Sequence, residues 1–181
     1  MMLSLAERRL QMTFDVYSDG STRRNGKAGA IGAWAYVILN DSGKMHEDCQ
    51  VEVDTTNQRM ELMAAAEALE YLFNNGIAKP FDKVIVYTDS AYLHNCYTDK
   101  WYVRWQANNW RNTKRQEVAN KELWQRLIKF FEMPEVEIVK VKGHADNRWN
   151  CYVDDLAQSA SARFSEARAK EMSEVAALCK L

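Results

Sequence analysis

The apolar residues of the chain follow two different periods, and the change of period marks the expected elements. Residues 12–19, 30–39 and 45–53 alternate between apolar and polar types and are rich in aromatic and β-branched side chains. This pattern predicts three strands joined by hairpin turns, with the first strand ending at Asp19. From Asn57 the apolar residues recur every three or four positions, which predicts an amphipathic helix.

The second half of the chain alternates between short strands and helices. Residues 83–89 form an apolar run of strand length that ends in Asp89, and residues 90–131 have a mostly helical composition. Residues 135–141 alternate as a fifth strand, and residues 148–178 contain neither Pro nor Gly, which predicts a closing helix. The element order βββαβαβα predicts an α/β fold, with a five-stranded mixed sheet and helices packed on both faces.

Composition narrows the class of protein. A chain of 181 residues is long enough for one compact core, and its net charge of −1 gives no general attraction to polyanions. Any affinity for nucleic acid must therefore come from a local basic patch. The four cysteines lack CxxC spacing, and neither a signal peptide nor a membrane span is indicated, so we expect a cytoplasmic protein.

Four acids stand at the expected ends of elements: Asp19, Glu61, Asp89 and Asp154. If the first and fourth strands are parallel neighbours, these side chains can converge, and the Gly20 that follows Asp19 leaves room for a ligand. Four gathered carboxylates repel one another unless hard cations such as Mg²⁺ or Mn²⁺ neutralise them. Two such ions, about 3.5–4 Å apart, would clamp the attacking and leaving oxygens of a phosphodiester.

A simpler interpretation of each acid stays open at this point. An Asp at the end of a strand is more often a turn former or a helix cap than a metal ligand. Glu61, in the first turns of its helix, is favoured by the helix dipole. Spacing alone does not decide between the two interpretations.

Four segments carry a resemblance to a known family. They are residues 17–21 (YSDGS), 56–65 (TNQRMELMAA), 87–90 (YTDS) and 141–144 (VKGH), the last followed ten residues after its His by residues 154–157 (DDLA). In this order the chain resembles a ribonuclease HI over residues 14–160. We therefore expect a ribonuclease H domain at residues 12–160, an N-terminal extension at 1–11 and a C-terminal helical extension at 161–181.

The resemblance implies an activity and its cofactor. A ribonuclease HI cuts the RNA strand of an RNA–DNA hybrid and leaves 5′-phosphate and 3′-hydroxyl ends, with two Mg²⁺ ions held by the four acids; Mn²⁺ can substitute. The position of His144 implies a role in proton transfer or product release, whereas a lone His in such a loop is otherwise most often a surface residue. The ten-residue interval from His144 selects Asp154, and not Asp155, as the ligand.

The family also implies where the hybrid is held. Asn57 and Gln58 match positions that read the RNA strand, where an amide can contact the 2′-hydroxyl. Asn57 could instead cap the helix that it precedes. Asn25 and Thr56 match positions near a DNA phosphate pocket, and Asn25 could equally be only a turn residue.

Residues 101–121, which we call the handle, are the local basic patch. They contain five cations against one acid, a net charge of +4, with tryptophans between the cations. We expect this segment to contact the DNA strand. The candidates are Trp101, Arg104, Trp105, Arg111 and Lys121. Alternatively the tryptophans anchor a core, above all Trp110 and Trp124, and the cations form a solvated face.

Two rival functions are compatible with the same residues. The chain could be a hybrid-binding module without catalysis, although the presence of all four acids argues against that. It could also be a DNA-directed nuclease of the same fold. Residues 106–109 lack the cationic cluster of many family members, so hybrid affinity is expected to be weaker or to fall off at lower salt. We expect a monomer without an obligate protein partner.

Overall fold

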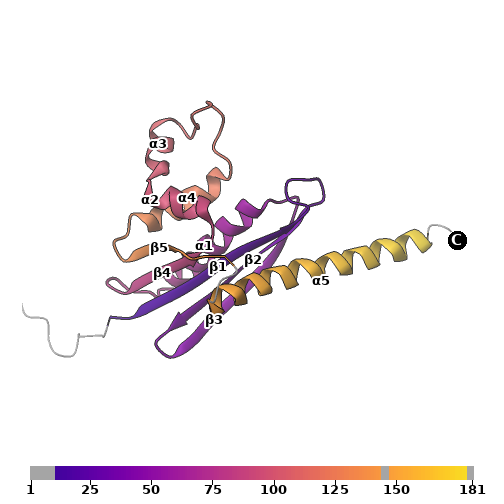
Figure 1. The fold of residues 1–181 in the computed structure, drawn as a ribbon, viewed down its shortest axis with the longest axis horizontal. Coiled ribbons are helices and arrows are strands. Elements are labelled where there is room, and N and C mark those ends of the chain that lie inside the picture. Colours follow the sequence, from indigo (N-terminus) through magenta and orange to yellow (C-terminus); the bar gives the residue numbers. More distant parts are fainter. Residues whose placement is uncertain (1–10, 144–146, 179–181) are drawn as a thin grey trace, which may run out of the picture.

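The computed structural model describes residues 11–143 and 147–178 as one sheet with helices on both of its faces (Figure 1). The strands are β1 (Thr13–Arg23), β2 (Ile31–Asn40), β3 (Gly43–Val53), β4 (Lys83–Thr88) and β5 (Val136–Lys140). The helices are α1 (Asn57–Asn74), α2 (Ala91–Thr98), α3 (Trp101–Ala107), α4 (Lys121–Phe131) and α5 (Arg148–Leu178). The predicted α/β architecture is confirmed.

The strand order is β3-β2-β1-β4-β5. The pairs β1–β2 and β2–β3 are antiparallel, as hairpins require, whereas β1–β4 and β4–β5 are parallel and are connected through helices. The predicted mixed sheet therefore has its first and fourth strands as parallel neighbours. Consequently the chain leaves the sheet at the same end after β1 and after β4.

Alternation along β2 shows how the two faces are filled. Trp34 and Tyr36 belong to the main core together with Met60 and Leu69 of α1, while Ala33 and Ala35 lie in a second cluster with Ala157 of α5. Large side chains thus face the layer that contains α1 and α4, and alanines let α5 approach closely on the other side.

The first strand is longer than its pattern predicts. β1 does not end at Asp19 but continues to Arg23, because its pairing with β2 extends to Arg23 opposite Ile31. Only the parallel pairing with β4 stops early, at Tyr17 opposite Tyr87. Asp19 therefore lies inside a strand, just beyond the point where that strand loses one of its two neighbours.

The handle is less helical than its composition predicts. α3 ends at Ala107, and α4 begins only at Lys121. Between them Asn109, Trp110, Arg115 and Asn120 have φ angles between +48° and +62°, which are incompatible with a continuing α-helix. In Figure 1 this part rises above the sheet as a separate lobe.

Candidate active site

Asp19 is a buried carboxylate in the middle of the sheet. It is 6% exposed and lies opposite Ala35 of β2. Its Oδ1 accepts a hydrogen bond of 2.7 Å from the backbone N–H of Gly20. A carboxylate so far from water needs a partner to stay charged, and one backbone donor supplies only part of what it needs.

Gly20 brings helix α1 against β1. A Cβ added at this glycine would lie 2.3 Å from the backbone nitrogen of Glu61 and 2.5 Å from the carbonyl carbon of Met60. The space beside Gly20 is therefore filled by the backbone of α1 and is not left for a ligand, which corrects the expectation from the sequence. The missing side chain lets Glu61 approach Asp19.

Two hydrogen bonds orient the side chain of Glu61. Asn57 donates from Nδ2 to Oε1 at 2.7 Å, and Ser90 donates from Oγ to Oε2 at 2.5 Å. Ser90 also caps α2, because its Oγ accepts from the N–H of Leu93 at 3.2 Å. Ser90 was not among the predicted site residues, although its place between a strand-end acid and a helix is a typical capping signal.

Asp89 directly follows β4 and lies against the chain that leaves β5. A Cβ added at Gly143 would be 2.8 Å from Oδ2 of Asp89, so no larger residue fits there without a shift. Gly143 is the last residue described before the gap at 144–146. His144 lies outside the described residues.

Asp154 projects from the second turn of α5. Its Oδ1 accepts a hydrogen bond of 2.6 Å from Nε2 of Gln158, one turn further along. Asp155 is exposed, while Asp154 is half-buried and interacts electrostatically with Asp19. Successive residues of a helix point about 100° apart, which explains why these neighbours differ.

Burial and like charge together perturb the pKa values of the acids. Burial raises the pKa of Asp19 to about 8, with further increases from Asp89, Asp154 and Glu61, while the Gly20 N–H opposes them. Burial also raises the pKa of Glu61, as does Asp89, against the hydrogen bonds from Ser90 and Asn57. The structure thus brings the other three predicted acids within electrostatic range of Asp19.

The donor set fits a hard divalent cation. It consists of carboxylate oxygens, which Mg²⁺ and Mn²⁺ prefer. Burial and the neighbouring carboxylates make the ionised form of Asp19 unfavourable, and a bound cation would stabilise that form. Within residues 11–143 and 147–178, no three acid, His or Cys side chains are already closed into a coordination cluster. The carboxylates are neighbours rather than a preformed cage.

The predicted RNA-reading residues lie where α1 begins. Thr56, not Asn57, is the N-cap of α1, since its side chain accepts from the N–H of Arg59 at 3.2 Å. The backbone N–H of Asn57 is bound instead by Oδ1 of Asn25, at 3.0 Å. Gln58 is exposed. Asn25, Thr56 and Asn57 therefore each have a structural partner at this site.

The handle is built on packed tryptophans. Trp105 contacts the rings of Trp101, Trp110 and Trp124, with centroids 5.4–6.4 Å apart, and Trp124 is fully buried. Trp101, Trp105 and Trp110 are partly buried against the core. A cavity of about 370 Å³ is lined by Trp101, Trp105 and five polar residues, Arg104, Asn108, Arg111, Asn112 and Thr113. The tryptophans thus both anchor the handle and line a groove on it.

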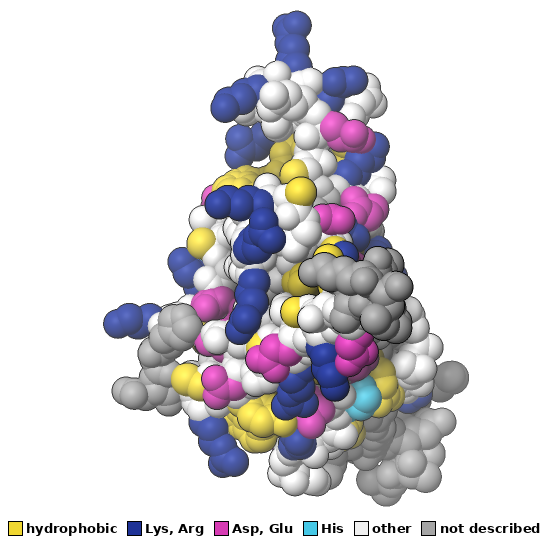
Figure 2. All heavy atoms as spheres, turned by 90° about the vertical axis from the view of Figure 1, so that its right-hand side faces the viewer, with side chains coloured by type: hydrophobic (Ala, Val, Ile, Leu, Met, Phe, Trp, Pro, Cys, Tyr) yellow, Lys and Arg dark blue, Asp and Glu magenta, His cyan; other side chains and the backbone are white. Residues whose placement is uncertain are grey.

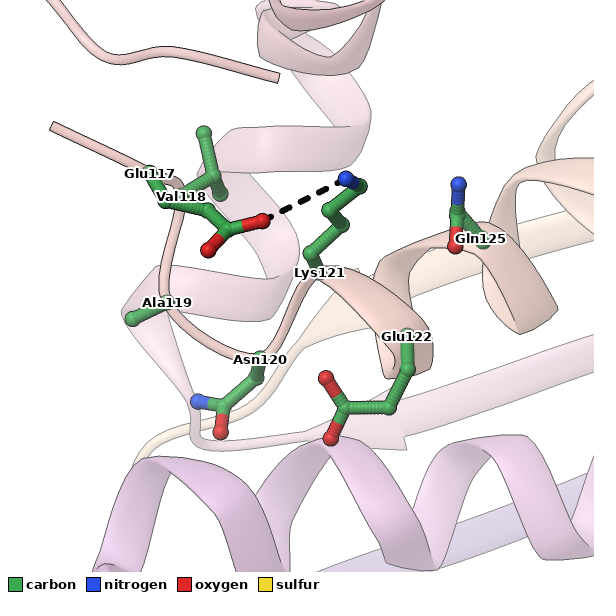
Figure 3. A pocket seen from close by; sticks show the side chains of 7 residues that line it. All are labelled: Glu117, Val118, Ala119, Asn120, Lys121, Glu122 and Gln125. Carbon is green, nitrogen blue, oxygen red and sulfur yellow. Dashed lines mark hydrogen bonds and ion pairs between the residues drawn. The ribbon is translucent and has the colours of Figure 1, made fainter. Parts of the chain in front are cut away.

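The cations of the handle are displayed on its surface. Arg104 and Arg111 are exposed, and Arg111 donates to the backbone carbonyl of Arg115 at 2.8 Å. Lys121 pairs with Glu117 at 3.3 Å beside a cavity of about 490 Å³, where Glu122 points toward α1 (Figure 3). In Figure 2 Lys and Arg side chains continue from the tip of this lobe down the left of the visible face.

Comparison with known proteins identifies the family. The family model described as RNase H matches residues 11–162. A ribonuclease H of Syntrophomonas wolfei subsp. wolfei is 41% identical over 145 residues, which are 80% of this chain and 93% of the relative. A ribonuclease H of Clostridium botulinum is 39% identical over 150 residues, 83% of this chain and 96% of the relative.

Solved structures show the same fold. LC9-RNase H1, a type 1 RNase H with the type 2 active-site motif, has a TM-score of 0.70 at 25% identity, over 86% of this chain and 75% of that one. LC11-RNase H1, solved in complex with an RNA/DNA hybrid, has a TM-score of 0.62 at 22% identity, over 83% and 97%. From the family match and these relatives, the chain belongs to the ribonuclease H family.

Proposed function

We propose that this protein is an endonuclease that hydrolyses the RNA strand of RNA–DNA hybrids and leaves 5′-phosphate and 3′-hydroxyl ends. The observation that carries the proposal is the buried Asp19, coupled to three further carboxylates from separate elements, in a chain whose relatives bear the name ribonuclease H. LC11-RNase H1, a protein of the same fold, binds an RNA/DNA hybrid. A nucleic-acid substrate also fits the basic handle.

We propose that Asp19, Glu61, Asp89 and Asp154 hold two Mg²⁺ ions, for which Mn²⁺ substitutes. Bound ions of this kind lower the pKa of a water and stabilise negative charge on a leaving oxygen. Hydrogen bonds from neighbouring residues hold two of these carboxylates in position. Asn57 and Ser90 fix both oxygens of Glu61, and the N–H of Gly20 fixes one oxygen of Asp19.

Recognition of the hybrid is proposed to involve both strands. Gln58, exposed at the start of α1, would contact a 2′-hydroxyl of the RNA, with Asn57 beside it. Asn25 and Thr56 would lie near a DNA phosphate, and the handle residues Trp101, Arg104, Trp105, Arg111 and Lys121 would contact the DNA strand. His144 is proposed to assist proton transfer or product release.

The catalytic unit is proposed to be residues 12–160, with extensions on either side. The family match over residues 11–162 supports this division, and residues 166–174 of α5 are exposed along their whole length. Action as a monomer in the cytoplasm belongs to the same proposal. None of the helices in the described part of the chain is both long and apolar enough to span a membrane.

A cleavage assay tests the function. Labelled RNA–DNA hybrid, RNA duplex and DNA duplex are incubated with the protein and Mg²⁺, and only the RNA strand of the hybrid should be cut. Asp19→Asn should lower the rate by at least about 10²–10³-fold, the scale of losing one charged group at a reacting centre. EDTA should abolish cleavage.

The adjacent acids of α5 supply a matched pair of variants. Asp154→Asn should lose activity like Asp19→Asn, while Asp155→Asn, which changes an exposed neighbour, should retain it. Cleavage that survives Asp19→Asn would refute the metal mechanism. Binding of the hybrid without any cleavage would instead indicate a binding module, and preferred cleavage of the DNA duplex would indicate a DNA-directed nuclease.

A further inference from the structure

A second basic surface lies away from the handle, on the hairpin between β1 and β2. Residues 23–29, which we call the basic hairpin, contain Arg23, Arg24 and Lys27 and no acid, a net charge of +3 in a chain of net charge −1. All three side chains are exposed. Within the described residues none of them forms an ion pair.

The basic hairpin is held in a fixed position. Oδ1 of Asn25 accepts from the N–H of Asn57, and the N–H of Gly29 donates to Oδ1 of Asp54 at 2.6 Å. Inside the turn the N–H of Lys27 donates to the carbonyl of Arg24 at 3.0 Å. The hairpin is thus attached to the first residue of α1, one turn before Glu61.

The topology puts the basic hairpin and the handle on either side of the acids. β1 and β4 are parallel, so the hairpin after β1 and the helices after β4 leave the sheet at the same end. In the strand order the hairpin belongs to the β1–β2 side and the handle to the β4–β5 side, with Asp19 and Asp89 between them. Figure 1 shows both rising from the sheet, one at each side of α1.

The base of the hairpin borders a cavity that two arginines help to line. Arg23, Arg24, Gly29 and Ile31 line a volume of about 390 Å³ together with Ser165 of α5. Arg168 lies three residues after Ser165 and so on the same face of α5. Guanidinium groups bind phosphate oxygens in pairs, whereas the hydroxyl of Ser165 donates to the carbonyl of Ser161 at 2.7 Å, so the arginines are the donors of this cavity.

We propose that the basic hairpin is a second phosphate-binding surface, which holds the backbone of the hybrid duplex on the side of the acids opposite the handle. The proposal rests on the proposed function, since it takes the substrate to be a duplex lying across the four carboxylates. A duplex backbone carries a phosphate charge every few ångströms, so a substrate long enough to pass the acids meets both basic surfaces.

A binding experiment tests the proposal. Binding of a hybrid is measured by fluorescence anisotropy at several salt concentrations, in an Asp19→Asn background so that cleavage does not interfere. The hairpin variant is Arg24→Gln/Lys27→Gln. Its control is Lys79→Gln/Lys83→Gln, which removes two exposed lysines at the end of the sheet where β4 begins. Thermal unfolding of each variant shows that the fold is kept.

Loss of two phosphate contacts should reduce the slope of log Kd against log salt by about 2 and raise Kd roughly tenfold at low salt. The control should change neither. An unchanged slope and Kd, or an equal change in the control, would overturn the hairpin surface. Failure of the unmodified protein to cleave hybrid would overturn the function itself, so the two failures are distinguishable.

Discussion

The acids and the handle represent two ways of placing charge. Asp19 is buried, and the side chain of Glu61 is positioned by two hydrogen bonds. The backbone of Glu61 also packs so closely against Gly20 that a Cβ on that glycine would not fit. The cations of the handle are exposed and stand on packed tryptophan rings. Like charges are forced together in one region, whereas in the other they are spread over a surface that water can reach.

The difference indicates which property each region requires. Catalysis needs particular atoms at fixed positions, so the acid site depends on the backbone and tolerates few substitutions. Attraction of a phosphate backbone, the role proposed for the handle, needs mainly positive charge and approximate placement, so single cations of the handle should be replaceable. Perturbation of the acid site should therefore change folding and catalysis together, and perturbation of the handle should change affinity alone.

The largest effect is expected from pH. Because the pKa of Asp19 is raised to about 8 in the folded protein, the folded state keeps a proton that the unfolded state loses above its ordinary pKa of 3.8. This contribution is fully present below that lower value and disappears as the pH rises through about 8. Metal-free protein should lose stability on the order of 4 kcal/mol between pH 5 and pH 8, as followed by urea unfolding.

Asp19→Asn sharpens this prediction, because it should flatten the pH dependence and stabilise the metal-free protein at pH 8 while it abolishes cleavage. The amide oxygen of Asn can still accept from the N–H of Gly20. Added Mg²⁺ should stabilise the unmodified protein at pH 8 more than the variant. Identical pH profiles for the two proteins would mean that Asp19 is not the group responsible.

A somewhat smaller effect is expected from Gly20→Ala. The added Cβ would meet the backbone of Met60 and Glu61, which no rotamer change can relieve, so α1 must shift. The substitution should destabilise the fold by about 3 kcal/mol and reduce cleavage, measured by urea unfolding and by the hybrid assay. Gly26→Ala, at a φ of +71° with nothing within 4 Å, should cost only about 1 kcal/mol. Equal effects at the two glycines would contradict the proposed close approach.

The smallest effect on stability is expected in the handle. Arg104→Gln/Arg111→Gln removes two exposed charges and should leave the unfolding midpoint unchanged. The salt slope of hybrid binding should fall by about 2, with kcat nearly unaffected at saturating substrate. A large loss of kcat would mean that the handle takes part in more than attraction.

The sequence predicted the elements better than their limits. All five strands lie where the periodicity indicates, since burial on one face imposes a readable pattern, and the closing helix lies where the absence of Pro and Gly predicts it. The predicted end of β1 was wrong, because an acid interrupts the alternation while the backbone pairing continues. The helix in the handle is interrupted where residues such as Asn109 and Trp110 adopt the left-handed backbone conformation, which amino-acid composition does not predict.

The candidate site shows the same division. The four acids could be selected from their motifs. The hydrogen bond from Ser90 to Glu61 could not, because it joins residues that are 29 positions apart in the sequence and depends on how α1 packs against the start of α2. The space for a ligand expected beside Gly20 was wrong, because the backbone of α1 occupies it, and that contact between distant segments cannot be predicted from the sequence.

The ion pairs at the root of the handle have a mechanical consequence. Glu122 of α4 pairs with Arg59 of α1. Arg126 of α4 binds Glu67 at 2.6 Å and Glu70 at 2.8 Å, and these two acids lie more than a turn beyond Arg59 on α1. Two separate attachments restrain the rotation of α4 against α1 more than a single one would. The orientation of the lobe is therefore tied to α1, the same helix that carries Glu61.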